Sequence, residues 1–518
     1  MIETLYGAIM IRPAKAVFAA LFFAVLTAIP GNLAASTGNT SYTITITEEQ
    51  PRIAVIEAVV VADQGFLWMN DDGDQGLPHG WSTFVRGLEV RDADNKVLET
   101  VYEPLSRWRL VDRQADTKDE ASPLTLRYEV LLQHDRFPLN FGDNGAAYMR
   151  DDAVMWSGRA LFIVGQASRD IELTLRIPGD WKATTPWNRI EGEAGRYTVA
   201  TTDDLVNSAF MVGAHREQTV RQGPLELRLA LSGPQVSAAE EVFAGELGKY
   251  LEYYDSTIGH APRRNMIVIA ADSTYWGGEV MGRAISLSVA GEISGPNPML
   301  AHIFAHEIVH LWGLDINFAA EDEEELYWFY EGMLAEYLSF LANVRLGDIS
   351  QDEFLAQLGE NFAKYQAAAE PGLSMSTAGH QKAAHYDLIY SGGMMAGAAL
   401  DLVVRDSSGN KSGLEDLIRT LYVEYPKATG SRAKPGVRTL DSDAISQVAA
   451  ETFDPEIGAR LRAWVDGSTP IPFVAVASAA GIRVAPDEGS ESADELLIHT
   501  ETPTAQQQSI FDSIVKGR

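Results

Sequence analysis

Two short segments of the chain hold residue types that together could bind a zinc ion and use it for hydrolysis. The first reads HEIVH from His306 to His310, and the second reads WFYEG at 328–332 and contains Glu331. Two imidazoles and one carboxylate are zinc ligands that leave a fourth position open for water. Glu307 lies beside the first imidazole and could take a proton from that water. The set predicts hydrolysis of peptide bonds with one zinc ion.

These residues need two helices to bring them together. Residues 298–314 are apolar enough for a buried helix, in which positions four apart share a face. Glu331 lies among large apolar residues in a second predicted helix, 326–341. A buried carboxylate is costly unless it is paired or bound to a metal, so we predict Glu331 as the third ligand. The alternative is an acid paired with an arginine or a helix end. His302, one turn before His306, is predicted to be a core or supporting histidine.

The hydrophobic pattern predicts several domains in an α+β multidomain chain. From 36 to 218, short segments such as 171–177 alternate between polar and apolar residues, which is typical of a β-sandwich. From 219 to 345, strands give way to helices, which favours an α+β unit that contains the HExxH motif. Residues 346–484 have helical spacing and are predicted to form a helical lobe. Residues 485–518 are acidic and polar, and we predict a flexible tail.

The first 35 residues resemble a secretion signal. Arg12 and Lys15 precede an apolar run at 16–29, which small residues follow. The run is about 14 residues long, whereas a helix that spans a bilayer needs roughly 20. We therefore predict a signal peptide at 1–35 and a periplasmic or secreted protein. An uncleaved membrane anchor is the alternative, and Met10 is an alternative start.

Composition narrows the classes of partner. The chain of 518 residues has 41 Lys and Arg against 72 Asp and Glu, and its formal net charge is −31. This charge argues against nucleic acid and anionic membrane surfaces as partners. The chain has no cysteine, which excludes disulfides, zinc bound by cysteine and a thiol nucleophile. We expect peptide or protein substrates and no membrane span in the mature chain.

Several motifs resemble those of one peptidase family. HEIVHLW, which ends at Trp312, and WFYEG resemble the zinc-binding segments of the glycyl aminopeptidase family of gluzincin metallopeptidases, which is related to the aminopeptidase N family. Residues 389–394 resemble its Tyr-x-x-Gly helix, and 414–419 resemble a later acidic segment that ends in arginine. The likeness spans about 225–484.

The resemblance implies a β-sandwich, a thermolysin-like catalytic unit and a helical lobe. It also implies that Tyr390 donates its hydroxyl to the oxyanion of the tetrahedral intermediate. A phenol aimed at developing negative charge would stabilise the transition state. Without the resemblance, Tyr390 would be an ordinary core or interface tyrosine.

The segment before the zinc helix departs from the family pattern. Related aminopeptidases have a Gly-Gly-Leu-Glu-His-like motif there, whose carboxylate binds the free amine of the substrate. This chain has Gly278 followed by Glu279, but the Glu-His pair is not in register. We predict Gly278, Glu279 and Ser286 as substrate contacts, with the substrate added along the strand at 284–289. Glu279 could equally be an acid in a turn.

Together these features predict a secreted or periplasmic zinc metallopeptidase that is aminopeptidase-like. Two alternatives stay open. One is an endopeptidase or narrow processing protease of the same fold. The other is a catalytically silent relative that binds peptides, although the complete ligand set and Glu307 count against it.

Overall fold

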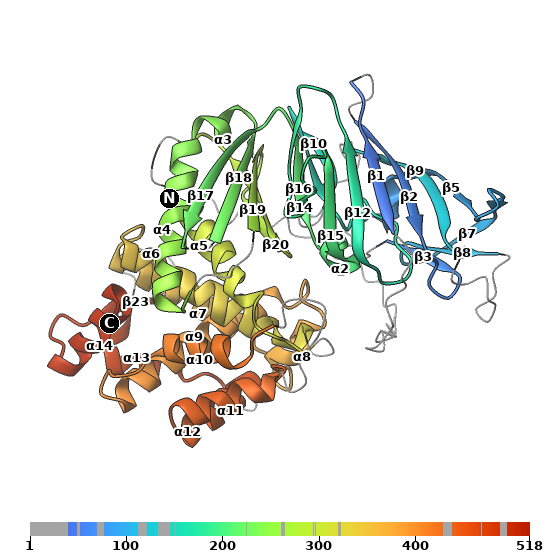
Figure 1. The fold of residues 1–518 in the computed structure, drawn as a ribbon. Helices are drawn as coiled ribbons and strands as arrows, with labels where there is room; N and C mark the ends of the chain where they lie inside the picture. The colour runs from blue at the N-terminus through green and yellow to red at the C-terminus, as the bar shows by residue number, and fades with distance from the viewer. Residues whose placement is uncertain are drawn as a thin grey trace.

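The structure of the chain is a computed structural model (Figure 1). It describes residues 40–48, 52–69, 77–111, 122–132, 146–150, 152–223, 225–260, 265–293, 295, 297–319, 323–427, 438–467, 469–486 and 495–518. The signal peptide predicted at 1–35 lies outside these residues and stays a prediction.

The N-terminal region is built from β-sheets. One sheet has eight strands in the order β14-β15-β12-β1-β2-β9-β5-β6, and another has four in the order β10-β11-β16-β13. Both sheets bury residues in one core, such as Ile56 and Leu126 of the larger sheet and Trp156 and Phe210 of the smaller. Alternating burial along these strands is the pattern from which we predicted a sandwich.

The strands of this region are β1 (Ser41–Thr45), β2 (Ile53–Val60), β3 (Phe66–Trp68), β4 (Pro78–Trp81), β5 (Val85–Arg91), β6 (Val97–Leu98), β7 (Thr100–Glu103), β8 (Arg107–Leu110), β9 (Leu124–Leu131), β10 (Tyr148–Arg150), β11 (Ala153–Ser157), β12 (Arg169–Arg176), β13 (Lys182–Thr184), β14 (Asn188–Arg189), β15 (Arg196–Thr201) and β16 (Ala209–Gly213). Two short helices, η1 (Ser82–Phe84) and α2 (Thr202–Val206), lie between them.

A five-stranded sheet follows in the chain. Its strands are β17 (Arg216–Gln222), β18 (Leu225–Ser232), β19 (Asn265–Ser273), β20 (Gly277–Met281) and β21 (Ala284–Ala290), in the order β17-β18-β19-β21-β20. β18, β19 and β21 are parallel neighbours, and β20 runs antiparallel at one edge. β21 therefore has a hydrogen-bonded strand on each side, so no substrate strand can be added to it. The prediction that the substrate lies along 284–289 is wrong, because β20 is the strand at the edge.

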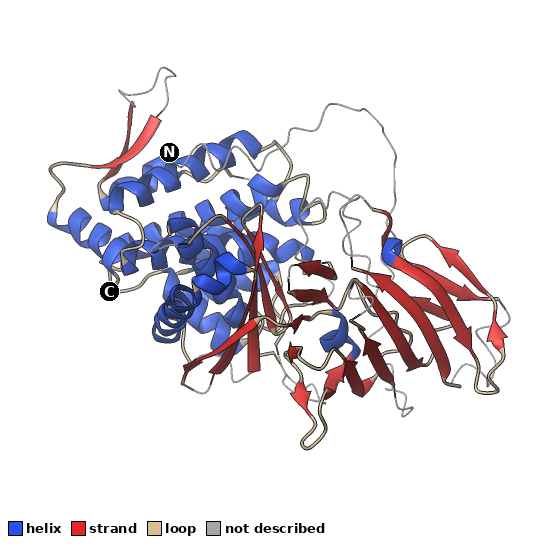
Figure 2. Ribbon diagram, turned by 90° about the horizontal axis from the view of Figure 1, so that it is seen from above, coloured by secondary structure: helices blue, strands red, loops and turns tan. Residues whose placement is uncertain are grey.

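The five-stranded sheet separates two hydrophobic cores. On one face, residues such as Leu229 and Ile285 pack with the helices. On the other face, Ile267, Ile269 and Ala284 belong to the core of the N-terminal sheets. Figures 1 and 2 show the N-terminal strands and the helices on opposite sides of this sheet. The N-terminal sheets and the helices thus pack against opposite faces of this one sheet.

Helices make up most of the rest of the chain. They are α3 (Pro234–Ala238), α4 (Glu240–Thr257), α5 (Pro298–Gly313), η3 (Glu324–Leu326), the π-helix η4 (Trp328–Tyr337), α6 (Leu338–Leu346), α7 (Gln351–Ala368), α8 (Met375–Gly379), α9 (Tyr386–Ser407), α10 (Leu414–Glu424), α11 (Ser442–Thr452), α12 (Pro455–Val465), α13 (Phe473–Ala477), η5 (Ser478–Ala480) and α14 (Ala505–Lys516). A hairpin of β22 (Ile482–Pro486) and β23 (Glu495–His499) precedes α14. The α+β multidomain fold with a helical C-terminal lobe, predicted from the sequence, is confirmed.

Helix α9 runs through the middle of the helical lobe. Within the part of the chain that the structure describes, it is the one helix long and apolar enough to cross a membrane. Its most apolar window is 83% buried inside the fold, and it packs against η4, α7 and α12. These contacts make α9 the core helix of the lobe.

The C-terminal residues are more ordered in structure than we predicted. The prediction of a flexible acidic tail from 485 to 518 is wrong for Ala505–Lys516, which form helix α14. The hydroxyl of Thr504 and the side chain of Gln507 cap the start of this helix reciprocally. Ile510 and Ile514, four residues apart, are buried on one face. The apolar spacing was present in the sequence, but it covers one short helix among polar residues.

Candidate active site

Three predicted ligands converge between α5 and η4. Asn297 caps the start of α5 by accepting hydrogen bonds from two backbone amides, and the helix then places His306 and His310 on one face. Glu331 approaches from η4, with Oε2 at 3.6 Å from His306 Nε2 and 3.5 Å from His310 Nε2. The three ligand atoms lie within 4.8 Å of one another, as in a metal site.

This geometry fits zinc. Tetrahedral bonds of about 2.0 to 2.1 Å separate neighbouring ligand atoms by about 3.3 Å, close to the separations between Glu331 and the histidines. The donor set of two imidazoles and one carboxylate is also one that zinc accepts in catalytic sites. His306, His310 and Glu331 would therefore hold the ion.

Glu307 lies next to the ligands, under the edge strand. It is 7% exposed, and burial raises its pKa to about 7, although His306 opposes this shift. A Cβ atom at Gly278 of β20 would lie 2.4 Å from Glu307 Oε1. The absence of a side chain at Gly278 therefore lets the edge strand and this carboxylate approach each other closely. A carboxylate placed beside the metal ligands is suited to take and return a proton.

Glu331 is a buried carboxylate with compensation on several sides. Burial alone would raise its pKa, but Lys382 and the two histidines outweigh this effect and hold it well below its usual range. Lys382 Nζ lies 2.6 Å from Glu331 Oε1, so the lysine and the histidines contact different oxygens of the carboxylate. Lys382 thus leaves Oε2 to face the metal site.

Glu336 supports the first ligand from behind. Its Oε1 lies 3.3 Å from His306 Nδ1, and its Oε2 lies 3.6 Å from His302 Nε2. The π-helix repeats hydrogen bonds over five residues, which brings Glu331 and Glu336 toward the same side. Hydrogen-bond partners behind a metal ligand fix its ring orientation. His302 is accordingly a supporting histidine.

Tyr390 reaches the site from α9. Its ring lies nearly parallel to that of His306, with centroids 6.3 Å apart, and it stacks on Tyr386 at 4.0 Å. Burial raises the pKa of Tyr390 well above its usual value, so the phenol keeps its proton and can donate it in a hydrogen bond. The Lys382 ammonium also lies 5.2 Å from the centre of this ring.

The three residues predicted to contact substrate have different surroundings in the structure. Gly278 lies beside Glu307, as described above. Glu279 faces the N-terminal sheets, where its Oε1 is 2.8 Å from Arg159 Nη1. Ser286 is fully buried, and its hydroxyl lies 3.2 Å from the sulfur of Met155. The Ser286 side chain therefore lies outside the site, because its position on β21 points it into the domain interface.

Sequence reasoning missed three charged residues that act here. Glu336 had a local signal, since it lies five residues after Glu331 in the same apolar segment. Lys382 and Arg159 had none, because each reaches its partner from a segment far away in the sequence. Only the folded chain brings them to the site.

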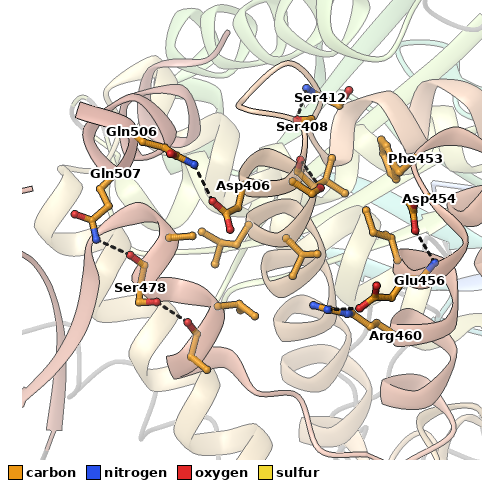
Figure 3. A pocket seen from close by; sticks show the side chains of 18 of the residues that line it. Asp406, Ser408, Ser412, Phe453, Asp454, Glu456, Arg460, Ser478, Gln506 and Gln507 are labelled. Atoms are coloured by element: carbon orange, nitrogen blue, oxygen red, sulfur yellow. Dashed lines mark hydrogen bonds and ion pairs between the residues drawn. The ribbon is translucent and has the colours of Figure 1, made fainter. Parts of the chain in front are cut away.

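A separate hollow of about 860 Å³ lies in the helical lobe (Figure 3). Its lining includes the C-terminal end of α9, where Asp406 accepts a hydrogen bond from Gln506 at 2.9 Å, and α12, where Glu456 pairs with Arg460. Asp406 lies sixteen residues beyond Tyr390 on α9, which is about 24 Å along the helix axis. This hollow is thus distinct from the zinc site.

Comparisons with known proteins agree with this fold. Residues 77–214 match the Peptidase M61 N-terminal domain. The fold is similar to an aminopeptidase N family protein from Idiomarina loihiensis, with a TM-score of 0.71, 19% identity, and coverage of 87% of this chain and 80% of that one. It is also similar to an M1 zinc metallopeptidase from Deinococcus radiodurans, with a TM-score of 0.52, 13% identity and coverage of 84% and 95%. A variant of that enzyme has been solved with a Tyr-Ser-Ala substrate. A comparison with curated proteins gave no match.

These findings confirm the resemblance stated from the sequence. The N-terminal match lies in the β-sheet region, and the similarity to the solved structures extends over 87% and 84% of this chain. Together with the His306, His310 and Glu331 cluster, they identify a gluzincin-like zinc metallopeptidase fold.

We predict that Glu336→Gln weakens zinc binding by roughly 10- to 100-fold, because His306 loses a charged hydrogen-bond partner. Competition with a zinc-binding dye measures the affinity. Glu325→Gln is the matched control, since Glu325 pairs with the exposed His380 instead. Equal affinities in both variants would show that Glu336 does not support the site.

Proposed function

We propose that this chain is a zinc-dependent peptidase. The observation that carries the proposal is the convergence of His306, His310 and Glu331 beside Glu307, directly under an edge strand. Metal ligands, a proton acceptor and a surface for an extended peptide thus meet at one place. This arrangement suits hydrolysis of a peptide bond held along the strand.

Glu307 would act as general base and then as general acid. When bound, zinc would polarise the scissile carbonyl and lower the pKa of a water molecule. Glu307 would accept the proton of the attacking water and pass it to the leaving amine.

Tyr390 would stabilise negative charge as it develops on the carbonyl oxygen. Its protonated hydroxyl can donate a hydrogen bond, and its ring is held by Tyr386 and by the Lys382 ammonium. A donor placed before the reaction needs no reorganisation when the charge appears.

The substrate backbone would pair with β20. This strand ends the described five-stranded sheet, so its outward backbone groups can form hydrogen bonds with an extended peptide. Gly278 lies on this strand next to Glu307, so a peptide paired there passes the catalytic carboxylate. Backbone pairing makes few demands on side chains.

Two specificities are compatible with this chemistry. The family resemblance favours an aminopeptidase, and the N-terminal match to the M61 family supports that reading. An endopeptidase or processing protease of the same fold is the second candidate. The ion pair between Glu279 and Arg159 favours this second candidate. Arg159 occupies the carboxylate on the edge strand that could otherwise bind the free amine of a substrate.

We also propose that the protein is exported, because residues 1–35 combine a basic start, a short apolar run and small residues. N-terminal sequencing of the protein recovered from its producing cells would locate the cleavage site. A mature chain that retains residues 16–29 would contradict cleavage and favour a membrane anchor.

Glu307→Gln should keep zinc and lower peptidase turnover by at least 100-fold, because the amide cannot accept the proton. Zinc content by mass spectrometry and hydrolysis of a peptide library, with and without a chelator, are the measurements. The wild-type protein loaded with zinc is the reference. If the zinc-loaded wild-type protein also cleaves nothing, the chain is a catalytically silent relative. Full activity of Glu307→Gln would refute the role assigned to Glu307.

Tyr390→Phe should lower kcat by about 10² to 10³ with little change in KM or zinc content, because one oxyanion donor is lost. Steady-state kinetics on a peptide cleaved by the wild-type protein checks this. Tyr386→Phe is the matched control, since its ring stacks on Tyr390 and is 49% exposed. An unchanged kcat in Tyr390→Phe would exclude its hydroxyl from the reaction.

A further inference from the structure

The two faces of the edge strand β20 have different surroundings. Val280 is paired in register with Ile285, and both pack with the helices that carry the zinc ligands. Glu279 is paired with Ser286, which faces the N-terminal sheets. Because side chains alternate along a strand, Glu279 and Val280 point to opposite faces. The helix face of β20, where Gly278 meets Glu307, therefore carries no acid from this strand.

Glu279 is already engaged on its own face. Arg159, from the N-terminal region, donates to Glu279 Oε1 at 2.8 Å and to Asn207 Oδ1 at 3.2 Å. The two charged side chains are 22% and 35% exposed, so both are partly withdrawn from water. A substrate ammonium would have to displace the guanidinium from Glu279 to bind there.

The other acids described at the zinc site also have partners. Glu331 contacts the histidines and Lys382, and Glu336 contacts His302 and His306. Glu307 is reserved for proton transfer. Lys382 places an ammonium 2.6 Å from Glu331, so a second ammonium that approached from that side would meet like charge. Glu331 and Glu336 are thus already engaged by these partners and are not available to a substrate amine.

We propose that the site does not select substrates by a free amino terminus. Its substrates are peptide segments whose scissile bond lies inside a chain or behind a blocked amino terminus, held through the backbone on β20. A change of one position in a strand moves a side chain to the other face, and here it places the carboxylate of Glu279 against Arg159. This inference rests on the proposed peptidase function and defines its substrate class.

The test compares tetra-alanine amide with its N-acetylated form. We expect the zinc-loaded wild-type protein to cleave both with kcat/KM values that differ by less than threefold. Glu279→Gln should leave this ratio unchanged, because Glu279 faces the domain interface. A wild-type preference of thirtyfold or more for the free amine, or a loss of such a preference in Glu279→Gln, would overturn the proposal.

A gain of function supplies a second test. Val280→Glu places a carboxylate on the helix face of β20, and it should raise the preference for the free amine at least tenfold. Val280→Gln is the matched control of similar size and should leave the ratio near that of the wild type. An unchanged ratio in a folded, zinc-loaded Val280→Glu protein would count against the assignment of the two faces. If that variant does not fold, the wild-type and Glu279→Gln ratios decide.

Binding separates this inference from the peptidase function itself. In zinc-loaded Glu307→Gln, both peptides should bind with Kd values within threefold of each other, as measured by calorimetry. This result would support the inference even if the wild-type protein cleaved no peptide of the library, an outcome that would refute the proposed function alone. Tight binding of the free amine only would overturn the inference while leaving the peptidase function intact.

Discussion

A charged carboxylate inside a protein needs compensation on every side, and Glu331 imposes this requirement on the catalytic core. Two histidines face one of its oxygens and Lys382 faces the other. Without these partners, burial would favour its protonated form, which binds metal poorly. The helix α5, the π-helix η4 and the segment before α9 must therefore be in place together for Glu331 to stay ionised.

The scaffold meets this requirement by packing helices very closely. A Cβ atom on Gly393 of α9 would lie 2.0 Å from the backbone oxygen of Trp328, and one on Gly332 would lie 2.5 Å from the Cα atom of Gly393. The two glycines thus let α9 lie directly against η4, and Tyr390, one turn before Gly393, reaches the zinc site. A few residues further on, buried Asp401 accepts a hydrogen bond from Tyr337 at the end of η4 and joins Arg405 in an ion pair. Gly332 and Gly393 lie in two of the segments that resemble family motifs, so these segments contribute to helix packing as well as to the zinc site.

Local periodicity was sufficient to predict the parts of the site that lie on single helices. The spacing of His306 and His310 determines their common face, and the apolar neighbours of Glu331 indicate its burial. The order of the strands was not readable, because pairing between segments far apart depends on the tertiary fold; β21 was therefore taken for an edge. The π-helix was also missed, since its sequence resembles that of an ordinary apolar helix, and with it the position of Glu336. Lys382 and Arg159 depend entirely on tertiary contacts.

The shared sheet brings the N-terminal region next to the strand at the edge of the zinc site. Ile267 and Ala284 pack in the N-terminal core, whereas their neighbours along the strands pack against the zinc-binding helices. Because both faces of the sheet are packed, each side chain of β20 points either toward the zinc-binding helices or toward the N-terminal sheets. Arg159 acts at this division: it gives Glu279 a partner on the interface side, and the backbone of Gly278 remains as the surface next to Glu307. The side chain of Glu279 and the close approach of Gly278 to Glu307 thus lie on opposite faces of one strand, so the pairing with Arg159 keeps this carboxylate on the interface side while the zinc ligands lie on the other.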